Sequence, residues 1–517
     1  MNFPMNLEPA ISPSGPAIAP CNGLHPQGNF LADDRRGCGA GRTRGLAMCC
    51  HKLSRVALLG LLALGWTSSA PAAVKLPAVI GDNMVLQQGR PLPIWGWADK
   101  GEEVAVSVGN QKHSTKAGDD GRWKVMLNAL KPGDPLELTV KGSSGNTLTV
   151  KNVLVGEVWV CSGQSNMEMG ITMCDKAPEE IAAANYPKIR LLLVQNTTAT
   201  EPATDVNAAW APCTPQTIVA GGWGGFSAAA YYFGRHIHKE LNVPIGLIDT
   251  TVGGTAAELW TSRKTLEANP VLKPLAQGGS SSLYNGQIAP LMPYAIRGAI
   301  WYQGESNLDR AFQYRTLFPA MIANWRADWG QGDFPFGFVQ LAPFRYGQNP
   351  ANFAELCEAQ LMTLQSVPNT GMAVTMDIGN VGDIHPKNKQ DVGRRLALWA
   401  LAKVYNQKAL VYSGPIYKSM AVEGNKIRLK FDHVGGGLVA SDGKPLVEFT
   451  IAGADQKFVP AKAEIDGAAI VVSGEGVAAP VAVRYAWQET AQPNLANKES
   501  LPASPFRTDT WKCVTEK

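Results

Sequence analysis

The stretch Glu157-Val-Trp-Val-Cys-Ser-Gly-Gln-Ser-Asn-Met-Glu-Met169 decides how the rest of this 517-residue chain is interpreted. Its apolar part, residues 158–161, predicts a strand, and a small polar turn, 163–166, follows directly. A strand that ends in such a turn places a hydroxyl at the carboxyl edge of a sheet, where open α/β sheets form their crevices. Ser165 is therefore a candidate nucleophile. Serines also cap helices, so the turn alone leaves both roles open.

Downstream of this stretch, short apolar strands alternate with longer segments of helical periodicity. This alternation predicts an α/β domain with parallel strands and helices on both faces of the sheet. The predicted strands are 158–161, 189–194, 245–250, 298–303, 336–341 and 373–377, and the predicted helices are 228–241, 311–329, 353–367 and 387–405.

Apolar and polar residues alternate with period two on both sides of this α/β region, between glycine-rich turns. That pattern predicts small antiparallel β regions. We therefore expect an N-terminal β domain at 74–153, the α/β domain at 154–407 and a C-terminal β domain at 408–517. The sequence leaves open whether the two β regions form one sheet. Residues 195–225 fit neither period and predict a long loop beside the crevice.

The N-terminal residues have the pattern of an export signal. Basic residues precede an apolar run at 56–66, and small residues follow it up to Ala73. This predicts a signal peptide at 48–73, removed on export to the periplasm or the outside of the cell. Signal peptides begin at a start methionine, so we expect translation to begin at Met48 and residues 1–47 to be a non-native extension.

Charge and cysteine content narrow the class of partner. Residues 1–73 hold six of the 47 Lys/Arg and three of the 43 Asp/Glu, which leaves 41 basic and 40 acidic residues in the remainder. A nearly neutral body argues against nucleic acid or an anionic membrane as the partner. We expect no metal site, because no His/Cys cluster has zinc spacing. Cys174 and Cys213 flank an irregular segment and are either disulfide-bonded or free.

A nucleophilic serine requires a base and an orienting acid. His385 lies between the last predicted strand and the last predicted helix, whereas the other histidines of the mature region lie in β regions or in a helix. Asp383 lies two residues before it, so both project to the same side of an extended segment. A carboxylate in that place fixes the imidazole tautomer and stabilises its cation. An acid at a helix N-terminus is the ordinary alternative.

Two further strand ends are rich in hydrogen-bond donors. Gly253 and Gly254 follow the strand at 245–250, where a backbone can approach a ligand closely. The motif Trp-Tyr-Gln-Gly-Glu-Ser-Asn at 301–307 follows the strand at 298–303 and includes Gln303, Glu305 and Asn307. The amides of Gln303 and Asn307 are candidate donors to an oxyanion.

Four motifs together resemble the sialate O-acetylesterase family of SGNH hydrolases: Gly-Gln-Ser-Asn-Met, Gly-Gly-Thr-x-x-Glu-x-Trp, Trp-Tyr-Gln-Gly-Glu-Ser-Asn and Asp-Ile-His-Pro. The likeness covers about 155–406 and extends to Leu86-Gln-Gln and Trp95-Gly-Trp97. Met167 takes the place of the second glycine of Gly-x-Ser-x-Gly, so an ordinary α/β-hydrolase is disfavoured. The resemblance implies a three-layer, flavodoxin-like domain. It maps the nucleophile onto Ser165 and the base onto His385.

The resemblance also leaves two assignments open. The glycine block maps onto Gly253 and Gly254, but Gln303 stands where the superfamily commonly has an Asn donor. The Asp-x-x-His spacing is shortened, so Asp383, which we prefer, and Asp377 both remain candidate acids.

The resemblance implies an acetylesterase that acts through an acyl-enzyme and needs no cofactor. Its expected partner is an O-acetylated sugar. Sialic acid is anionic, yet residues 163–170 contain no basic side chain. Acetylated plant hemicellulose, such as xyloglucan or xylan, is therefore the alternative substrate. A non-catalytic glycan-binding protein is the alternative from another class, and the presence of both Ser165 and His385 disfavours it.

Overall fold

The computed structural model describes residues 73–517, and its centre is a largely parallel sheet. The order across this sheet is β13-β12-β11-β7-β10-β8-β9, and every neighbouring pair is parallel except β8 with β9 at the edge. Without that edge pair, the five remaining strands follow the second-first-third-fourth-fifth order of flavodoxin-like sheets. The strands are β7 (Thr147–Gly163), β8 (Tyr186–Leu193), β9 (Trp210–Cys213), β10 (Ile245–Thr251), β11 (Gly298–Tyr302), β12 (Phe336–Val339) and β13 (Thr370–Ala373).

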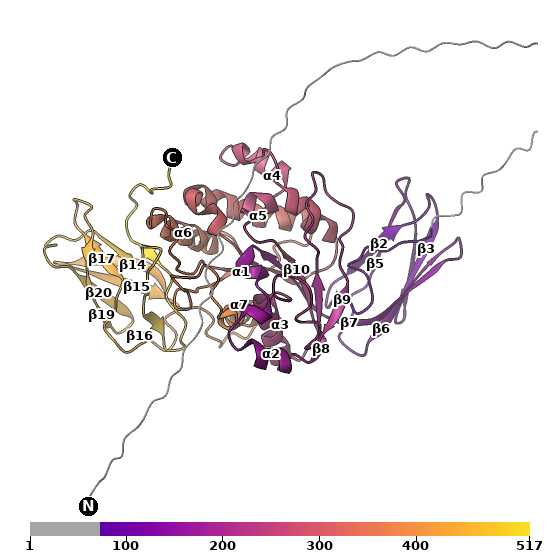
Figure 1. Cartoon of the computed structure of the whole chain (residues 1–517), viewed down its shortest axis with the longest axis horizontal. Coiled ribbons are helices and arrows are strands. Elements are labelled where there is room, and N and C mark those ends of the chain that lie inside the picture. Colours follow the sequence, from indigo (N-terminus) through magenta and orange to yellow (C-terminus); the bar gives the residue numbers. More distant parts are fainter. Residues whose placement is uncertain (1–72) are drawn as a thin grey trace, which may run out of the picture. The chain divides into compact units, whose positions relative to one another are not determined.

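Helices cover both faces of this sheet, which confirms the predicted three layers (Figure 1). On one face α3 (Ala228–Leu241) packs against α7 (Lys389–Lys403), and on the other α5 (Ala311–Trp329) packs against α6 (Ala351–Ser366). The shorter helical segments are α1 (Ser165–Glu168), α2 (Ala177–Ala183), α4 (Arg263–Ala268), η1 (Ile171–Met173), η2 (Ala257–Trp260), η3 (Lys273–Leu275), η4 (Tyr284–Ile288), η5 (Ala289–Leu291) and η6 (Glu305–Arg310).

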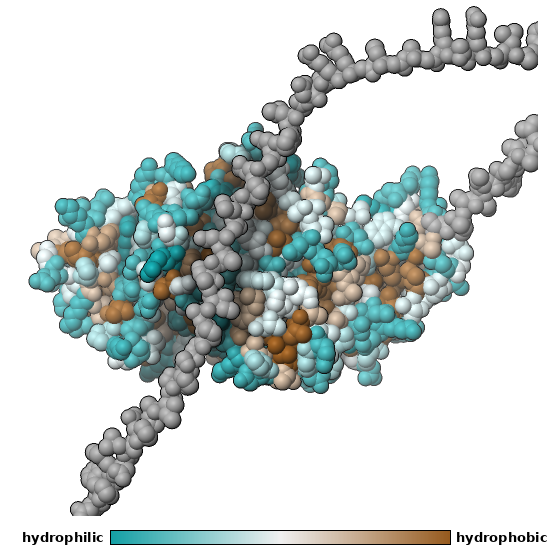
Figure 2. Space-filling view, in the orientation of Figure 1, coloured by the Kyte–Doolittle hydropathy of each residue, from teal (hydrophilic) through white to brown (hydrophobic). Residues whose placement is uncertain are grey.

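Buried aromatic side chains hold these layers together. Trp159 of β7 meets Phe233 of α3 and Trp399 of α7 edge to face, with ring centroids 5.0 Å and 6.3 Å away. On the opposite face, Trp301 of β11 packs against Trp325 of α5 at 5.9 Å. Edge-to-face pairs of buried rings stabilise a core beyond their area alone. Hydrophilic residues dominate the face shown in Figure 2, where hydrophobic ones form small scattered groups.

The β7 strand links the N-terminal β region to the central sheet. Its first part pairs with β6 in antiparallel fashion, and its second part is the parallel strand between β10 and β11. The boundary expected at 153/154 therefore falls inside one continuous strand. The other N-terminal strands are β1 (Val85–Gln87), β2 (Leu92–Trp97), β3 (Glu103–Val108), β4 (Gln111–Lys116), β5 (Arg122–Leu127) and β6 (Leu136–Gly142).

Within the described chain, the strands after residue 408 pair only with one another, in sheets of two and four strands. The two β regions therefore do not complete a common sheet, which answers the question left open by the sequence. These strands are β14 (Ile416–Glu423), β15 (Lys426–Asp432), β16 (Leu438–Ala440), β17 (Phe449–Ala452), β18 (Val459–Pro460), β19 (Lys462–Asp466), β20 (Ala469–Ser473), β21 (Ala482–Tyr485), β22 (Leu495–Asn497) and β23 (Phe506–Arg507).

Most predicted elements lie where the periodicity put them, and one is displaced. The last parallel strand, β13, ends at Ala373, where the predicted strand 373–377 begins. The strand was predicted too far along the chain because Val374 and Met376 are apolar, as strand residues often are. Both are buried in the structure, but they lie after the end of the strand. The segment 195–225 is irregular as expected, apart from the short edge strand β9.

The five cysteines of residues 73–517, Cys174 and Cys213 among them, are buried free thiols. The free-thiol alternative is thus the one that the structure contains. In the described part of the chain no helix is both long and apolar enough to cross a bilayer. The predicted extension, 1–47, and all of the predicted signal peptide except Ala73 lie outside the described residues.

Candidate active site

A sharp turn at the end of β7 presents Ser165. Gly163 adopts a φ of 141°, and a Cβ added there would lie 2.2 Å from the carbonyl oxygen of Tyr302 on β11. Only glycine fits so close to the neighbouring strand, and its φ is one that other residues rarely adopt. Ser165 then begins the short helix α1 and stays partly exposed. The strand runs to Gly163, two residues beyond the predicted end at Cys161, and places the hydroxyl at the carboxyl edge of the sheet as predicted.

His385 meets this serine from the loop before α7. Its Nε2 atom lies 2.9 Å from Ser165 Oγ, although the two residues are 220 positions apart in the chain. This is hydrogen-bonding distance, as proton transfer from the hydroxyl to the imidazole requires. The predicted nucleophile and base are thus brought together.

The two candidate acids have different partners. Asp383 Oδ1 accepts the backbone N–H of His385 at 2.9 Å, so this carboxylate lies beside the base and fixes the turn that carries it. Asp377 instead forms a bidentate ion pair with Arg395 of α7, in which the two guanidinium NH groups lie 2.7 and 2.6 Å from the two carboxylate oxygens. The geometry therefore favours Asp383 as the acid near the imidazole.

The surroundings keep the imidazole uncharged. Burial lowers the pKa of His385, the positive charge of Lys389 lowers that pKa further, and Asp383 opposes both by raising it. The net direction is downward from the ordinary value near 6.5. At neutral pH the imidazole is therefore in the form that can accept a proton.

A buried network lies directly behind the Ser165 turn. Lys389 Nζ donates to Asn166 Oδ1 at 2.5 Å, and Asn166 Nδ2 donates to Glu305 Oε1 at 2.6 Å and to the carbonyl of Ile384 at 2.9 Å. These bonds tie the turn after Ser165 to the loop that precedes His385. Burial lowers the pKa of Lys389 to about 8. Sequence reasoning missed Lys389, because a lysine at the start of a helix is ordinary.

The glycine pair after β10 lies against the serine. A Cβ on Gly253 would lie 3.4 Å from Ser165 Cβ and 2.9 Å from a carboxylate oxygen of Glu168. Gly254 has a φ of 71°, which favours glycine. Within residues 73–517, no acceptor pairs with the backbone N–H of Ser165 or of Gly254. Both donors are therefore free to meet a ligand beside the hydroxyl.

The amides of the third strand end turn inward instead. Gln303 is fully buried, and its Nε2 donates to the carbonyl of Thr255 at 3.2 Å and to Asn307 Oδ1 at 2.7 Å. Asn307 Nδ2 in turn donates to Glu258 Oε2 at 3.0 Å. Neither residue lines the cavity at Ser165. The structure thus does not bring the predicted amide donors to the reaction centre, because their N–H groups bind protein oxygens.

Glu305, the third candidate in that motif, does reach the cavity. One carboxylate oxygen accepts from Asn166, and the other is buried without a partner among the described residues. Burial raises the pKa of Glu305, and the backbone N–H of Glu305, the Asn166 hydrogen bond and the charge of Lys389 oppose this. Burial likewise raises the pKa of Glu168 on the adjacent wall. Two carboxyl groups therefore border the space in front of the serine.

These groups enclose an open cavity of about 510 Å³, within the ~300–1,000 Å³ range of small-molecule sites. The indole of Trp223, from the irregular segment 195–225, meets the His385 ring edge to face at 4.9 Å. No lysine or arginine is found among the described residues that line the cavity. No set of three metal-binding side chains converges anywhere in residues 73–517. The lining is Gln164, Ser165, Glu168, Trp223, Gly253, Gly254, Glu305, Ser306, Tyr346, Ile384 and His385.

Comparison with known proteins places this chain in a family. The carbohydrate esterase family of sialic acid-specific acetylesterases matches residues 155–402. The chain is also 30% identical to the sialate O-acetylesterase of Mus musculus over 513 residues, which covers 85% of this chain and 95% of the relative. The chain belongs to the sialate O-acetylesterase family of carbohydrate esterases.

A second curated relative and a solved structure extend the likeness. The human protein of that name is 32% identical over 487 residues, covering 85% of this chain and 93% of its own length. A crystal structure of a carbohydrate acetylesterase from Xanthomonas citri is 42% identical and superposes with a TM-score of 0.80, over 85% of this chain and all of that one. The flanking β regions are therefore part of the likeness as well as the central sheet.

Proposed function

We propose that this protein is a carbohydrate O-acetylesterase that removes acetyl groups from sugar hydroxyls through a serine acyl-enzyme. The observation that carries the proposal is the 2.9 Å contact between His385 Nε2 and Ser165 Oγ in an open cavity, in a chain that belongs to a carbohydrate acetylesterase family.

Acylation begins with proton transfer. Neutral His385 takes the proton of Ser165 as Oγ attacks the acetyl carbonyl, and Asp383 stabilises the imidazolium that forms. The backbone N–H groups of Ser165 and Gly254 stabilise the negative charge that develops on the carbonyl oxygen. His385 then protonates the departing sugar hydroxyl, and the acetyl group remains on Ser165.

Deacylation repeats these steps with water. His385 activates a water molecule that attacks the acetyl-serine, the same two N–H groups stabilise the second tetrahedral intermediate, and acetate leaves as Oγ recovers its proton. Gln303 does not contact the substrate. Its hydrogen bond to the Thr255 carbonyl holds the turn that follows Gly254.

Replacement of the nucleophile tests this proposal. Ser165→Ala is expected to lower turnover of p-nitrophenyl acetate by roughly 10³-fold or more, since loss of a triad nucleophile leaves only the oxyanion donors and binding. Ser114→Ala, on β4 in the N-terminal β region, is the matched control and is expected to retain activity. A correctly folded Ser165→Ala protein with parental turnover would refute the assignment.

The cavity also bears on the substrate. A dedicated site for anionic sialic acid is expected to offer a basic side chain, but the described lining holds two carboxyl groups, no cation and an exposed tryptophan. This favours, as second candidate substrate, the O-acetyl groups of a neutral hemicellulose such as xyloglucan or xylan. Acetate release from O-acetylated sialic acid and from acetylated hemicellulose, compared as kcat/KM, separates the two.

We further propose that the precursor is exported, with residues 48–73 as its signal peptide and Met48 as its first residue. The basic, apolar and small-residue order of that segment supports the proposal. N-terminal sequencing of the mature protein is expected to find a start close to Val74, and sequencing of the precursor that finds residues 1–47 attached would overturn Met48 as the first residue.

A further inference from the structure

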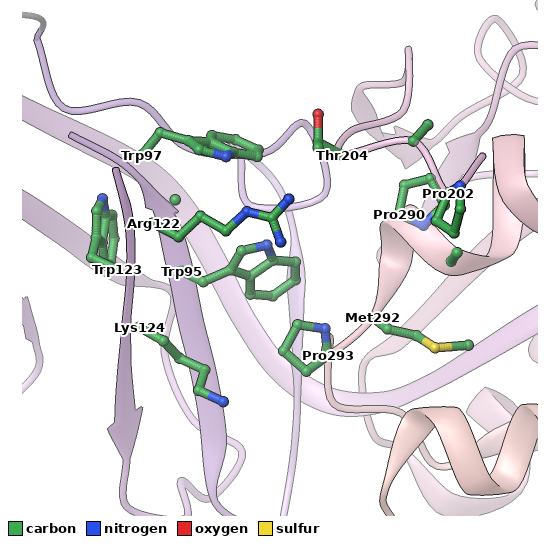
Figure 3. Close-up of a pocket in the computed structure, with 13 residues that line it drawn as sticks. Trp95, Trp97, Arg122, Trp123, Lys124, Pro202, Thr204, Pro290, Met292 and Pro293 are labelled. Atoms are coloured by element: carbon green, nitrogen blue, oxygen red, sulfur yellow. The ribbon is translucent and has the colours of Figure 1, made fainter. Parts of the chain in front are cut away.

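A second cavity lies in the N-terminal β region, on the ribbon formed by β2 and β5. Its volume is about 430 Å³, again within the ~300–1,000 Å³ range of small-molecule sites. It shares no lining residue with the cavity at Ser165. Figure 3 shows its two walls: side chains of the ribbon on one side, and Pro202, Pro290 and Pro293 on the other.

The pairing of the ribbon explains which side chains face this cavity. Trp95 lies opposite Lys124 and Trp97 lies opposite Arg122 in the antiparallel register. Residues two apart in a strand share a face, so the two tryptophans and the two cations project together. Figure 3 shows the Trp95, Trp97 and Arg122 side chains extending from the ribbon in one direction. The opposite face of β5 is buried in the core.

Contacts behind the cavity hold its aromatic wall in place. Trp95 meets the buried Tyr294 edge to face at 6.3 Å. Trp97 is fixed through its backbone, which exchanges two hydrogen bonds with Lys75 at 2.8 and 3.0 Å. Both indoles nevertheless remain partly exposed. Two half-exposed indoles, of which Trp95 is held by its packing on Tyr294, offer flat apolar surface at little cost in side-chain entropy, which suits the C–H face of a sugar ring.

The opposite wall is also anchored. The Ala203 N–H donates to the carbonyl of Asn285 at 2.9 Å, and Asp205 Oδ1 accepts the backbone N–H of Ala78 at 2.9 Å. The remaining wall residues include three prolines, whose φ angles are fixed. The cavity is thus formed before a ligand arrives, which lowers the entropic cost of binding.

The charge of the lining selects the kind of ligand. Arg122 and Lys124 are exposed, and they are the charged residues among the described residues of the lining. No carboxylate in residues 73–517 lies within ion-pair distance of Lys124. Arg122 approaches Asp120 only at 3.7 Å, and both side chains are about two-thirds exposed, so that pair is weak. The cavity therefore presents two available cations beside two indoles.

We propose that this cavity is a second glycan-binding site that takes a sugar residue carrying a carboxylate. The indoles of Trp95 and Trp97 stack on the ring, while Arg122 and Lys124 bind the carboxylate through charge-assisted hydrogen bonds. The site anchors an acidic glycan to the chain independently of the chemistry at Ser165. Two contacts with one polymer raise its apparent affinity.

Titration calorimetry with the full chain tests the proposal. The probes are a xylo-oligosaccharide bearing glucuronic acid and a sialylated lactose, with neutral xylotetraose and lactose as their counterparts. The expected result is that at least one acidic probe binds more tightly than its neutral counterpart, and that added salt reduces the difference. The two acidic arms distinguish a uronic acid from a sialic acid.

Variants locate the binding. Arg122→Gln/Lys124→Gln is expected to abolish the preference for the acidic probe. The control Lys112→Gln/Lys116→Gln removes the same charge from exposed positions on β4 and is expected to retain the preference. Trp97→Ala is expected to weaken binding about tenfold or more. Trp97 is chosen for this test because Trp95 packs on the buried Tyr294, so that Trp95→Ala would also disturb the fold. All of these variants are expected to turn over p-nitrophenyl acetate normally.

Three outcomes would overturn the proposal. The first is equal binding of acidic and neutral probes, and the second is equal loss of preference in the two charge variants. The third is the absence of glycan binding together with self-association that Trp97→Ala abolishes, which would assign the surface to a second copy of the chain. Loss of esterase activity in Ser165→Ala leaves the binding result unchanged, so the two proposals fail separately.

Discussion

The strands β7 and β11 are neighbours in the sheet, and the turns that follow them are both rich in polar side chains. The candidate nucleophile of the first turn faces the cavity, whereas the candidate amide donors of the second are buried. The first presents Ser165 to the cavity, within 2.9 Å of the base. The second directs Gln303 and Asn307 into the core, where they are 0% and 1% exposed. A polar strand end can therefore either supply the reacting group or hold the neighbouring turn in place. Exposure and hydrogen-bond partners distinguish the two.

The largest expected effect is at the base on the cavity side of this comparison. His385→Gln removes the acceptor of the Ser165 proton and is expected to lower kcat by roughly 10³–10⁶-fold. His433→Gln, in the C-terminal β region, is the control and is expected to retain activity. Stopped assays with p-nitrophenyl acetate measure both. Parental activity in folded His385→Gln would remove the imidazole from the mechanism.

Substitutions of the two aspartates near the base are expected to have different effects, one on kcat and the other on stability. Asp383→Asn is expected to lower kcat by roughly 10²–10⁴-fold, because the imidazolium loses its neighbouring carboxylate. Asp377→Asn breaks the ion pair with Arg395. It is expected to lower the free energy of unfolding by about 1–3 kcal/mol while kcat changes little. Steady-state kinetics and urea unfolding of both variants would show the reverse pattern if Asp377 were the acid.

Gln303→Leu tests the buried side of the comparison. As a residue that holds the turn after Gly254, Gln303 is expected to affect kcat by about tenfold or less. The unfolding free energy is expected to fall by about 1–3 kcal/mol, because Tyr314 and Asn307 lose a buried partner. Gln365→Leu, exposed on α6, is the control. A loss of 10²–10³-fold in kcat with unchanged stability would instead mark a direct oxyanion donor.

The smallest expected effect is a shift in the pH profile. The charge of Lys389 lowers the pKa of His385, and turnover requires the neutral imidazole. In the parent protein, kcat/KM is therefore expected to fall only as the pH drops through a value below the ordinary 6.5. Lys389→Met removes that charge, raises the pKa of His385 and moves the acid limb to higher pH. The exposed Lys387→Met is expected to shift it less, and equal shifts would contradict a specific effect of Lys389.

Periodicity predicted the fold well, because most strands and helices carry their own pattern of apolar residues. The parallel pairing, the helices at 228–241 and 311–329, and the polar turn at 163–166 needed no tertiary information, whereas the order of the strands across the sheet came only from the structure. The displaced last strand shows the limit: Val374 and Met376 are buried by contacts that the local pattern does not contain.

The candidate site was predictable in part for the same reason. Ser165 and His385 lie at the ends of secondary-structure elements, where the residue type and its position together indicate a catalytic role. The orientation of Gln303 was not predictable, since its partners at 255 and 307 come from two turns. Lys389 was missed because its burial and its bond to Asn166 arise only when α7 packs behind the serine turn.

Covalent labelling would show whether Ser165 attacks the substrate with His385 as its base. The full chain would be treated with a fluorophosphonate that reacts with activated serines, and the labelled peptide would be identified by mass spectrometry. We predict one label per chain, on Ser165, with loss of acetylesterase activity in proportion and no labelling of His385→Gln. Labelling of another serine with loss of activity, or full activity after labelling of Ser165, would contradict the account.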